Sequence, residues 1–169
     1  MYLHNKRCRF SRDTKLRCVN ALVRPILDYG CCVWDPRKSF QIDKLEKINK
    51  RAARFATGNY TLRHGSTKQN MDLLGWPPLQ ERRASIKLKM FYKIRSKTVC
   101  APLDYLISLS TPRRPFNYFV PQSLTDTHLQ SFYPSTIRLW NSLPETVKSA
   151  DSINTFTSAI SSITIRCSY

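Results

Sequence analysis

The stretch SFQIDKLEKINKRAARFAT, residues 39–57, decides how the chain folds, because two separate rows of side chains in it follow the period of an α-helix. Ser39 stands where a helix N-cap is expected, and Gly58-Asn59 supplies a stop signal. We therefore predict a helix over residues 39–57. Its apolar row, spaced by three and four residues, predicts one buried face made of Leu45, Ile48, Ala52 and Phe55.

The second row in this helix is basic and has the same spacing. At 100° per residue, the basic and apolar rows lie roughly 120° apart around the helix axis. A row of cations at one-turn intervals can follow the phosphates of a nucleic acid and release condensed counterions as it binds. We predict nucleic-acid contact here, with an ordinary solvated helix face as the alternative. The residues with this spacing are Lys44, Lys47, Arg51 and Arg54, and Lys50 extends the row.

The charge balance of the whole chain supports a polyanionic partner. Lys and Arg total 28 against 11 Asp and Glu, which gives a formal net charge of +17. Residues 37–97 hold 16 basic and 4 acidic residues, a net charge of +12. Such a local surplus favours RNA and/or DNA as the partner, and phosphate contacts alone do not distinguish the two. A second helix, over residues 79–97, adds the candidate contacts Arg82, Arg83, Lys87, Lys89 and Lys93.

The remaining sequence predicts a mainly α fold, an irregular bundle of about five to six helices with a Pro-rich loop segment and no sizeable sheet. Helical spacing also marks residues 13–34, where Pro25 should kink or split the helix. Strand patterning is poor throughout the chain. We expect a basic N-terminal lead-in at 1–12, a basic helical domain at 13–98, a Pro-rich linker or covering loop at 99–131, and a short C-terminal helical segment at 132–165, with Asp151 or Ser152 capping its last helix.

Several classes of function are not supported by the sequence. The six cysteines form no Cys-x-x-Cys pair and the three histidines are scattered, so we predict no metal site. A Gly-rich phosphate loop, a nucleophile elbow and a clustered carboxylate pair are all missing, and we predict neither a catalytic site nor a cofactor. We interpret Cys31 and Cys32 as small apolar packing residues. No signal peptide or membrane-spanning run is visible, which predicts an intracellular protein, cytoplasmic and/or nuclear, without a membrane partner.

The aromatic residues have two possible roles. Exposed rings can stack on unpaired bases, and Tyr118 and Phe119 are the better candidates for this because they stand near arginines in a predicted loop. Trp76 and Trp140 are expected in the core, since burial of an indole dominates a small helical core.

Four short sequence motifs, called words below, occur in a fixed order and resemble a known family. Together they look like the segment that follows the polymerase core in non-LTR (LINE-type, jockey-like) retrotransposon reverse transcriptases. Their shared order makes the resemblance more specific than any one word. The words are LVRPILDYGCCVWDP at 22–36, DKLEKINKRAARFATGNY at 43–60, LGWPPLQERR at 74–83 and FYPSTIRLWNSLP at 132–144.

The resemblance implies that this chain is the C-terminal, thumb-like part of an RNA-directed DNA polymerase, which grips template RNA and the primer duplex. The paired catalytic aspartates and the endonuclease of that family have no counterpart here, so the chain alone is expected to be inactive. We expect a reading frame that starts at Met1 to be a truncated element copy or a gene-model fragment. The missing polymerase core is a candidate partner, which would cover the apolar faces of residues 16–26 and 79–94.

Two other hypotheses stay open at this stage. The chain could be a non-catalytic protein-interaction or structural helical module, with its charge serving an acidic partner. It could also belong to a polymerase whose catalytic half lies on a separate chain. The sequence alone does not decide the oligomeric state.

Overall fold

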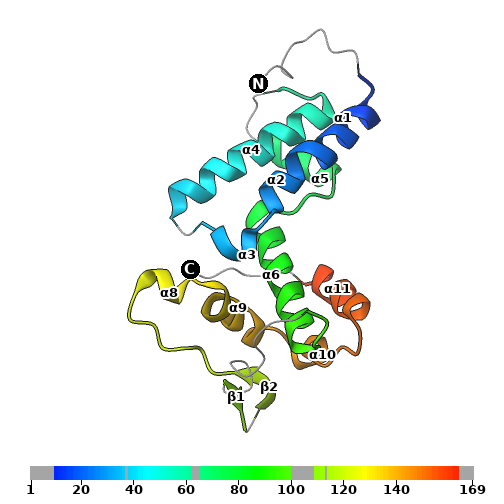
Figure 1. Cartoon of the computed structure of the whole chain (residues 1–169). Helices are drawn as coiled ribbons and strands as arrows, with labels where there is room; N and C mark the ends of the chain where they lie inside the picture. The colour runs from blue at the N-terminus through cyan, green and yellow to red at the C-terminus, as the bar shows by residue number, and fades with distance from the viewer. Residues whose placement is uncertain (1–9, 37, 62–64, 100–108, 113, 164–169) are drawn as a thin grey trace. The chain divides into compact units, whose positions relative to one another are not determined.

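The chain is mainly α-helical, and the described residues contain one two-stranded hairpin as their β structure (Figure 1). The structure is a computed structural model that describes residues 10–36, 38–61, 65–99, 109–112 and 114–163. This confirms the predicted class without a sizeable sheet. The elements are α1 (Arg12–Cys18), the π-helical turn η1 (Val19–Val23), α2 (Arg24–Asp28), α3 (Cys31–Trp34), α4 (Ser39–Thr57), α5 (Ser66–Leu73), α6 (Leu79–Arg95), β1 (Ser110–Thr111), β2 (Arg114–Tyr118), α8 (Asp126–Leu129), α9 (Phe132–Asn141), α10 (Glu145–Lys148) and α11 (Ile153–Ser161).

The chain divides into two compact units. The N-terminal unit contains the described residues of 10–29 and 38–79, and the C-terminal unit contains those of 30–36 and 80–163. The division falls within the span 13–98 that the sequence analysis treats as one helical domain. Among the helices in the described ranges, none combines the length and the apolar character needed to span a bilayer.

Pro25 splits the first helical segment, as predicted. The chain is α-helical as far as Cys18, widens into the π-helical turn η1, and starts α2 with Pro25 in its first turn. Proline donates no N–H bond, and its ring would clash with a carbonyl one turn earlier in a continuous α-helix. A π-helical turn is one of the ways in which a helix accommodates such a residue. Val19 and Leu27 on this segment are buried.

The helix α4 has the predicted bounds, but its ends and its buried face need two corrections. Ser39 is the first helical residue and not the cap, because Lys38 occupies the cap position without a side-chain bond. Gly58 closes the helix with a φ of 71°, in the left-handed region that glycine tolerates. The buried face is rotated from the predicted one, and Ile48 is 43% exposed. The buried residues of α4 are Asn49, Ala52, Ala53 and Ala56.

The small side chains on this face explain the rotation. The distance between two packed helices depends on the side chains at the contact, so the alanines allow α1 and α5 to approach α4 closely. Figure 1 shows α1 running alongside α4, and both neighbours contact it. Val19, Met71 and Trp76 complete this core. Trp76 is 7% exposed, which confirms its predicted place in the core.

The C-terminal unit is built around α6. Leu88 and Phe91 of α6 are fully buried and pack with residues of α9 and α11. Trp140 of α9 is also fully buried, as predicted, and its indole N–H donates to the Phe116 carbonyl at 2.7 Å. Ser152 caps α11 through a reciprocal capping box with Thr155, which confirms one of the two predicted caps.

Part of the predicted Pro-rich linker is ordered structure. Strands β1 and β2 pair in antiparallel fashion, although prolines made this stretch look like a loop. The side chain of Asn141 on α9 holds the hairpin: it accepts a bond from the Tyr118 N–H at 3.1 Å and donates to the Tyr118 carbonyl at 2.7 Å. Residues 1–9 of the predicted lead-in and 100–108 of the predicted linker lie outside the described residues.

Candidate nucleic-acid interface

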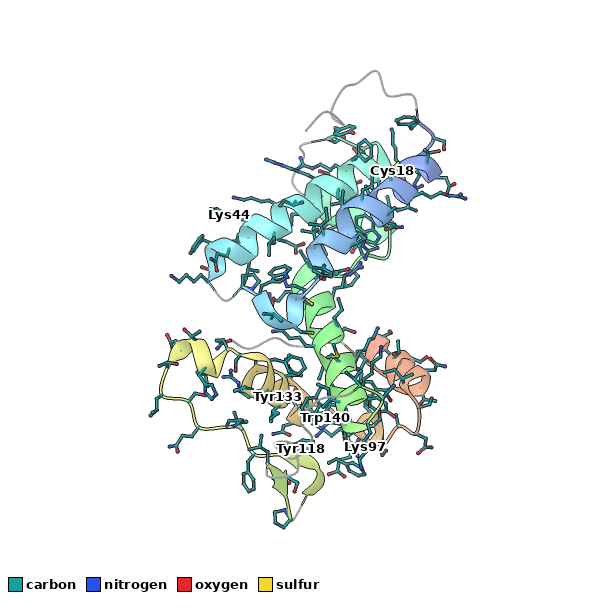
Figure 2. The ribbon with its side chains drawn as sticks, in the orientation of Figure 1. Cys18, Lys44, Lys97, Tyr118, Tyr133 and Trp140 are labelled. Atoms are coloured by element: carbon teal, nitrogen blue, oxygen red, sulfur yellow. The ribbon has the colours of Figure 1, made fainter. Side chains whose placement is uncertain are left out.

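The basic row of α4 lies on the surface of the N-terminal unit. Its members occupy the side of the helix opposite the buried alanines. At 100° per residue, the two sets of side chains are centred about half a turn apart around the helix axis. Figure 2 shows Lys44 on the side of α4 that faces away from α1. Of the five predicted residues, Arg54 is half-buried, and the exposed ones are Lys44, Lys47, Lys50 and Arg51. We call this set of five the α4 row.

The α4 row keeps its positive charge. Within the described residues, none of its five side chains forms an ion pair with a carboxylate. Glu46, which could have neutralised Lys50, instead accepts bonds from the Leu79 N–H at 3.0 Å and from the Asn49 side chain at 3.3 Å. Asp43 is exposed on the same helix and reduces the local charge by one. The row is therefore a net cationic strip, as the binding hypothesis requires.

A further cation lies at the C-terminal end of α4, and sequence reasoning missed it. The ammonium group of Lys15 on α1 lies 5.9 Å from the centroid of the Phe55 ring, in the geometry of a cation–π contact. The same group is the nearest atom to the position that a Cβ on Gly58 would occupy, at 3.7 Å. A cation is favoured there because the C-terminal end of a helix is electronegative. The packing of α1 on α4 brings this residue to the end of α4, so no local sequence pattern indicates it.

Two of the predicted contacts on α6 are wrong. Arg83 and Lys87 are buried, and both pair with Asp35, which belongs to the same compact unit. The Arg83 Nε lies 2.6 Å from one carboxylate oxygen of Asp35, and the Lys87 Nζ lies 2.5 Å from the other. Buried charges need such partners, because removing an ion from water without compensation is expensive. These two side chains therefore stabilise the unit and are not available to phosphates.

The other three candidates on α6 are at or near the surface. Lys93 is exposed, whereas Lys89 and Arg82 are half-buried, and Arg82 has a protein partner. Lys89 and Lys93 are four residues apart and so share one side of the helix. The α6 set thus shrinks from five predicted contacts to a short surface pair plus Arg82.

The site around Asp35 also changes the chemistry of a cysteine. The pKa of the half-buried Cys32 thiol is lowered from 9.0 to about 7, mainly by a side-chain hydrogen bond with Cys31 and also by the nearby Lys87. Burial and the Asp35 carboxylate act in the opposite direction. Cys31 is buried, as predicted for an apolar packing residue, but Cys32 is more acidic than that interpretation implies.

The predicted stacking residues differ in their accessibility. Tyr118 is half-buried and packs edge-to-face against Phe91, with ring centroids 5.4 Å apart, so it is part of the packing of the C-terminal unit. Phe119 is 57% exposed and remains open to a partner. Among the described residues, no group of three or more His, Cys, Asp and Glu side chains is arranged to hold a metal ion.

Comparison of the chain with protein-family models, with curated proteins and with solved structures finds no match. The geometry of the α4 row is consequently the main structural basis for a functional proposal.

Proposed function

We propose that this chain binds RNA and/or DNA through the α4 row, as the template/primer-gripping C-terminal fragment of a non-LTR retrotransposon RNA-directed DNA polymerase that is inactive by itself. The observation that carries the proposal is the outward-facing row of cations on one regular helix, which forms no ion pair with a carboxylate of the described residues. A retrotransposon fragment of this kind would act inside the cell, in the cytoplasm or the nucleus.

The dimensions of the row suit a phosphate backbone. Lys44 and Arg54 are ten residues apart, so the row extends about 15 Å along α4 at 1.5 Å per residue. Each Lys or Arg that neutralises a phosphate releases condensed counterions, and binding should therefore weaken steeply with salt. Four contacts correspond to a log–log slope of about −3 to −4. A solvated helix face without a ligand would have no such dependence.

The family part of the proposal rests on the four sequence words and on their order. One of these words contains the α4 row, so the implied grip and the independent electrostatic argument concern the same residues. The catalytic aspartate pair that holds the metal ions of such a polymerase has no counterpart in the printed sequence. The chain would then contribute binding and positioning to a polymerase and not its chemistry.

The proposal is tested with a labelled RNA hairpin and a labelled DNA duplex, titrated with the full chain at low salt and followed by fluorescence anisotropy. The matched variant reverses four charges of the α4 row, Lys44→Glu, Lys47→Glu, Arg51→Glu and Arg54→Glu. We expect the intact chain to bind and the variant to lose binding while keeping its helical circular dichroism spectrum. Equal binding by both proteins would show that the α4 row is not the interface.

A specific observation favours one alternative, a protein-interaction module. Leu22 on η1, Ile26 on α2 and Tyr29, which follows α2 as its C-cap, are spaced by four and three residues, and they are 62%, 74% and 84% exposed. The sequence analysis expected exposed apolar faces on residues 16–26 and 79–94. Leu22 and Ile26 of the first face are exposed, whereas Leu79 and Ile94 of the second are buried. An exposed apolar strip can mark a protein contact. This alternative predicts a defined oligomer or partner complex and weak nucleic-acid binding.

The remaining possibility, a polymerase with its catalytic half on another chain, shares with the proposal the expectation that this chain is inactive alone, and that expectation has a direct test. A primer-extension assay with the purified chain, a primed RNA template, nucleotides and Mg²⁺ should yield no product. Detectable extension would overturn the proposal that the chain is inactive alone.

A further inference from the structure

An exposed aromatic residue continues the α4 row. Phe40, Lys44, Lys47, Arg51 and Arg54 are spaced by 4, 3, 4 and 3 residues, which places all five on one side of the helix. Phe40 is 52% exposed and belongs to neither hydrophobic core. A basic row that ends in an open ring differs from an ordinary solvated face, because the ring is part of neither hydrophobic core and is about half exposed.

The next residue of the row, Lys44, contacts this ring. The ammonium group of Lys44 lies 5.4 Å from the centroid of the Phe40 ring, a cation–π contact between neighbouring turns of α4. The contact couples the aromatic residue to the cationic row and leaves about half of the side chain accessible. A flat apolar surface next to a positive charge is the arrangement that binds a base together with its phosphate.

We propose that the preferred partner of the α4 row is a single-stranded segment of nucleic acid, with one unpaired base stacked on Phe40 and the following phosphates along Lys44 to Arg54. The inference rests on the proposed function and narrows it. In a duplex, the bases are paired and stacked on one another, and only a terminal or extruded base offers a free face. Stacking on Phe40 therefore selects unpaired strand, or the single-stranded arm next to a duplex end.

The length of the strip fits one short strand. Phe40 and Arg54 are 14 residues apart, about 21 Å along the helix axis. Four phosphate contacts on a single strand give a log–log salt slope of about −2.8. The ring adds affinity without adding charge, so its removal should weaken binding at every salt concentration and leave the slope unchanged.

The test compares the intact chain with Phe40→Ala, Phe40→Tyr and Phe10→Ala, using three labelled ligands of equal length: an oligouridylate, an abasic oligonucleotide and a blunt RNA duplex. Phe10 is the matched control because it is a phenylalanine of the same compact unit, is 51% exposed and lies outside α4. We expect Phe40→Ala to weaken binding of the oligouridylate about 5-fold or more. Binding of the abasic ligand should not change, Phe40→Tyr should retain the affinity, and Phe10→Ala should have no effect.

Other outcomes separate the inference from the proposed function. An equal loss for the oligouridylate and the abasic ligand would overturn stacking, because Phe40 would then act through the helix. No loss for either ligand, or a loss only in Phe10→Ala, would also overturn the assignment to Phe40 while leaving the cationic grip intact. Absence of binding to all three ligands by the intact chain would reject the proposed function itself.

Discussion

Asp35 and Arg83 form a buried ion pair in the C-terminal unit, with the carboxylate Oδ1 2.6 Å from the guanidinium Nε and side-chain exposures of 6% and 1%. Lys87 shares the same carboxylate. Both Nη groups of Arg83 are buried without a hydrogen-bond partner in the described part of the chain. One acid therefore compensates two buried cations, and the unit depends on it.

Replacing Asp35 should destabilise the fold strongly. We expect Asp35→Asn to lower the free energy of unfolding by about 3–5 kcal/mol, because it leaves two buried cations without their counter-charge. Urea denaturation followed by tryptophan fluorescence measures the change. The control is Asp13→Asn, which breaks the surface pair with Arg17, where the side chains are 68% and 82% exposed. That variant should cost about 0.5 kcal/mol or less. Similar costs for both variants would contradict the structural role of the buried cluster.

The Cys32 thiol should be unusually reactive near neutral pH. Its lowered pKa predicts that the rate of alkylation by iodoacetamide, followed at Cys32 by peptide mass spectrometry, has its midpoint near pH 7. The chain unfolded in urea should have a midpoint near 9.0, the ordinary value. Cys31→Ala removes the largest cause of the shift and should raise the midpoint of Cys32 in the folded chain. Identical midpoints for folded and unfolded protein would contradict the described environment.

The same shift has a consequence for stability. The thiolate of Cys32 is favoured in the folded state, since its folded pKa lies below the unfolded one. Its contribution to stability is therefore fully present above pH 9 and is lost as the pH falls through 7. Urea denaturation of the intact chain and of Cys32→Ser at pH 7 and pH 9 should show this pH dependence in the intact chain and less of it in the variant.

The exposed strip on η1 and α2 should cause association without contributing to nucleic-acid binding. We expect the double variant Leu22→Lys and Ile26→Lys to reduce self-association in sedimentation velocity, because charges replace apolar side chains that are 62% and 74% exposed. Its affinity for RNA should not fall, since no residue of the α4 row is altered. A parallel loss of RNA binding would connect the two surfaces and favour an interface that includes both.

The elements with clear helical period were predictable, and long-range packing was not. The helix over residues 39–57 and the split at Pro25 followed from local chemistry: a terminal glycine and a proline without an N–H. The burial of Arg83 and Lys87 could not be predicted, because it depends on Asp35, which is about 50 residues earlier in the sequence. A charged residue on a helix gives the same sequence pattern whether its side chain faces solvent or pairs with a carboxylate that is distant in the sequence.

The hairpin and the ring of Phe40 are two further features that could not be predicted from the sequence. Strand β2 is held by Asn141, a contact across 23 residues that no periodicity indicates. Phe40 stood outside the predicted apolar row, so its place at the end of the cationic row became visible only when the buried face of α4 was known.

The salt dependence of binding tests the central claim most directly. We compare the intact chain with Lys44→Gln/Arg51→Gln on the α4 row and with Lys68→Gln/Lys97→Gln, a control pair of exposed lysines on other elements. Labelled RNA is titrated with each of the three proteins at a series of salt concentrations. For each protein, the logarithm of the association constant is plotted against the logarithm of the salt concentration, and the slope is compared. The account predicts that the α4 pair reduces the magnitude of the slope by about 2, while the control pair leaves it unchanged. Equal slopes for all three proteins, or equal reductions by the two pairs, would contradict the claim that α4 is the nucleic-acid interface.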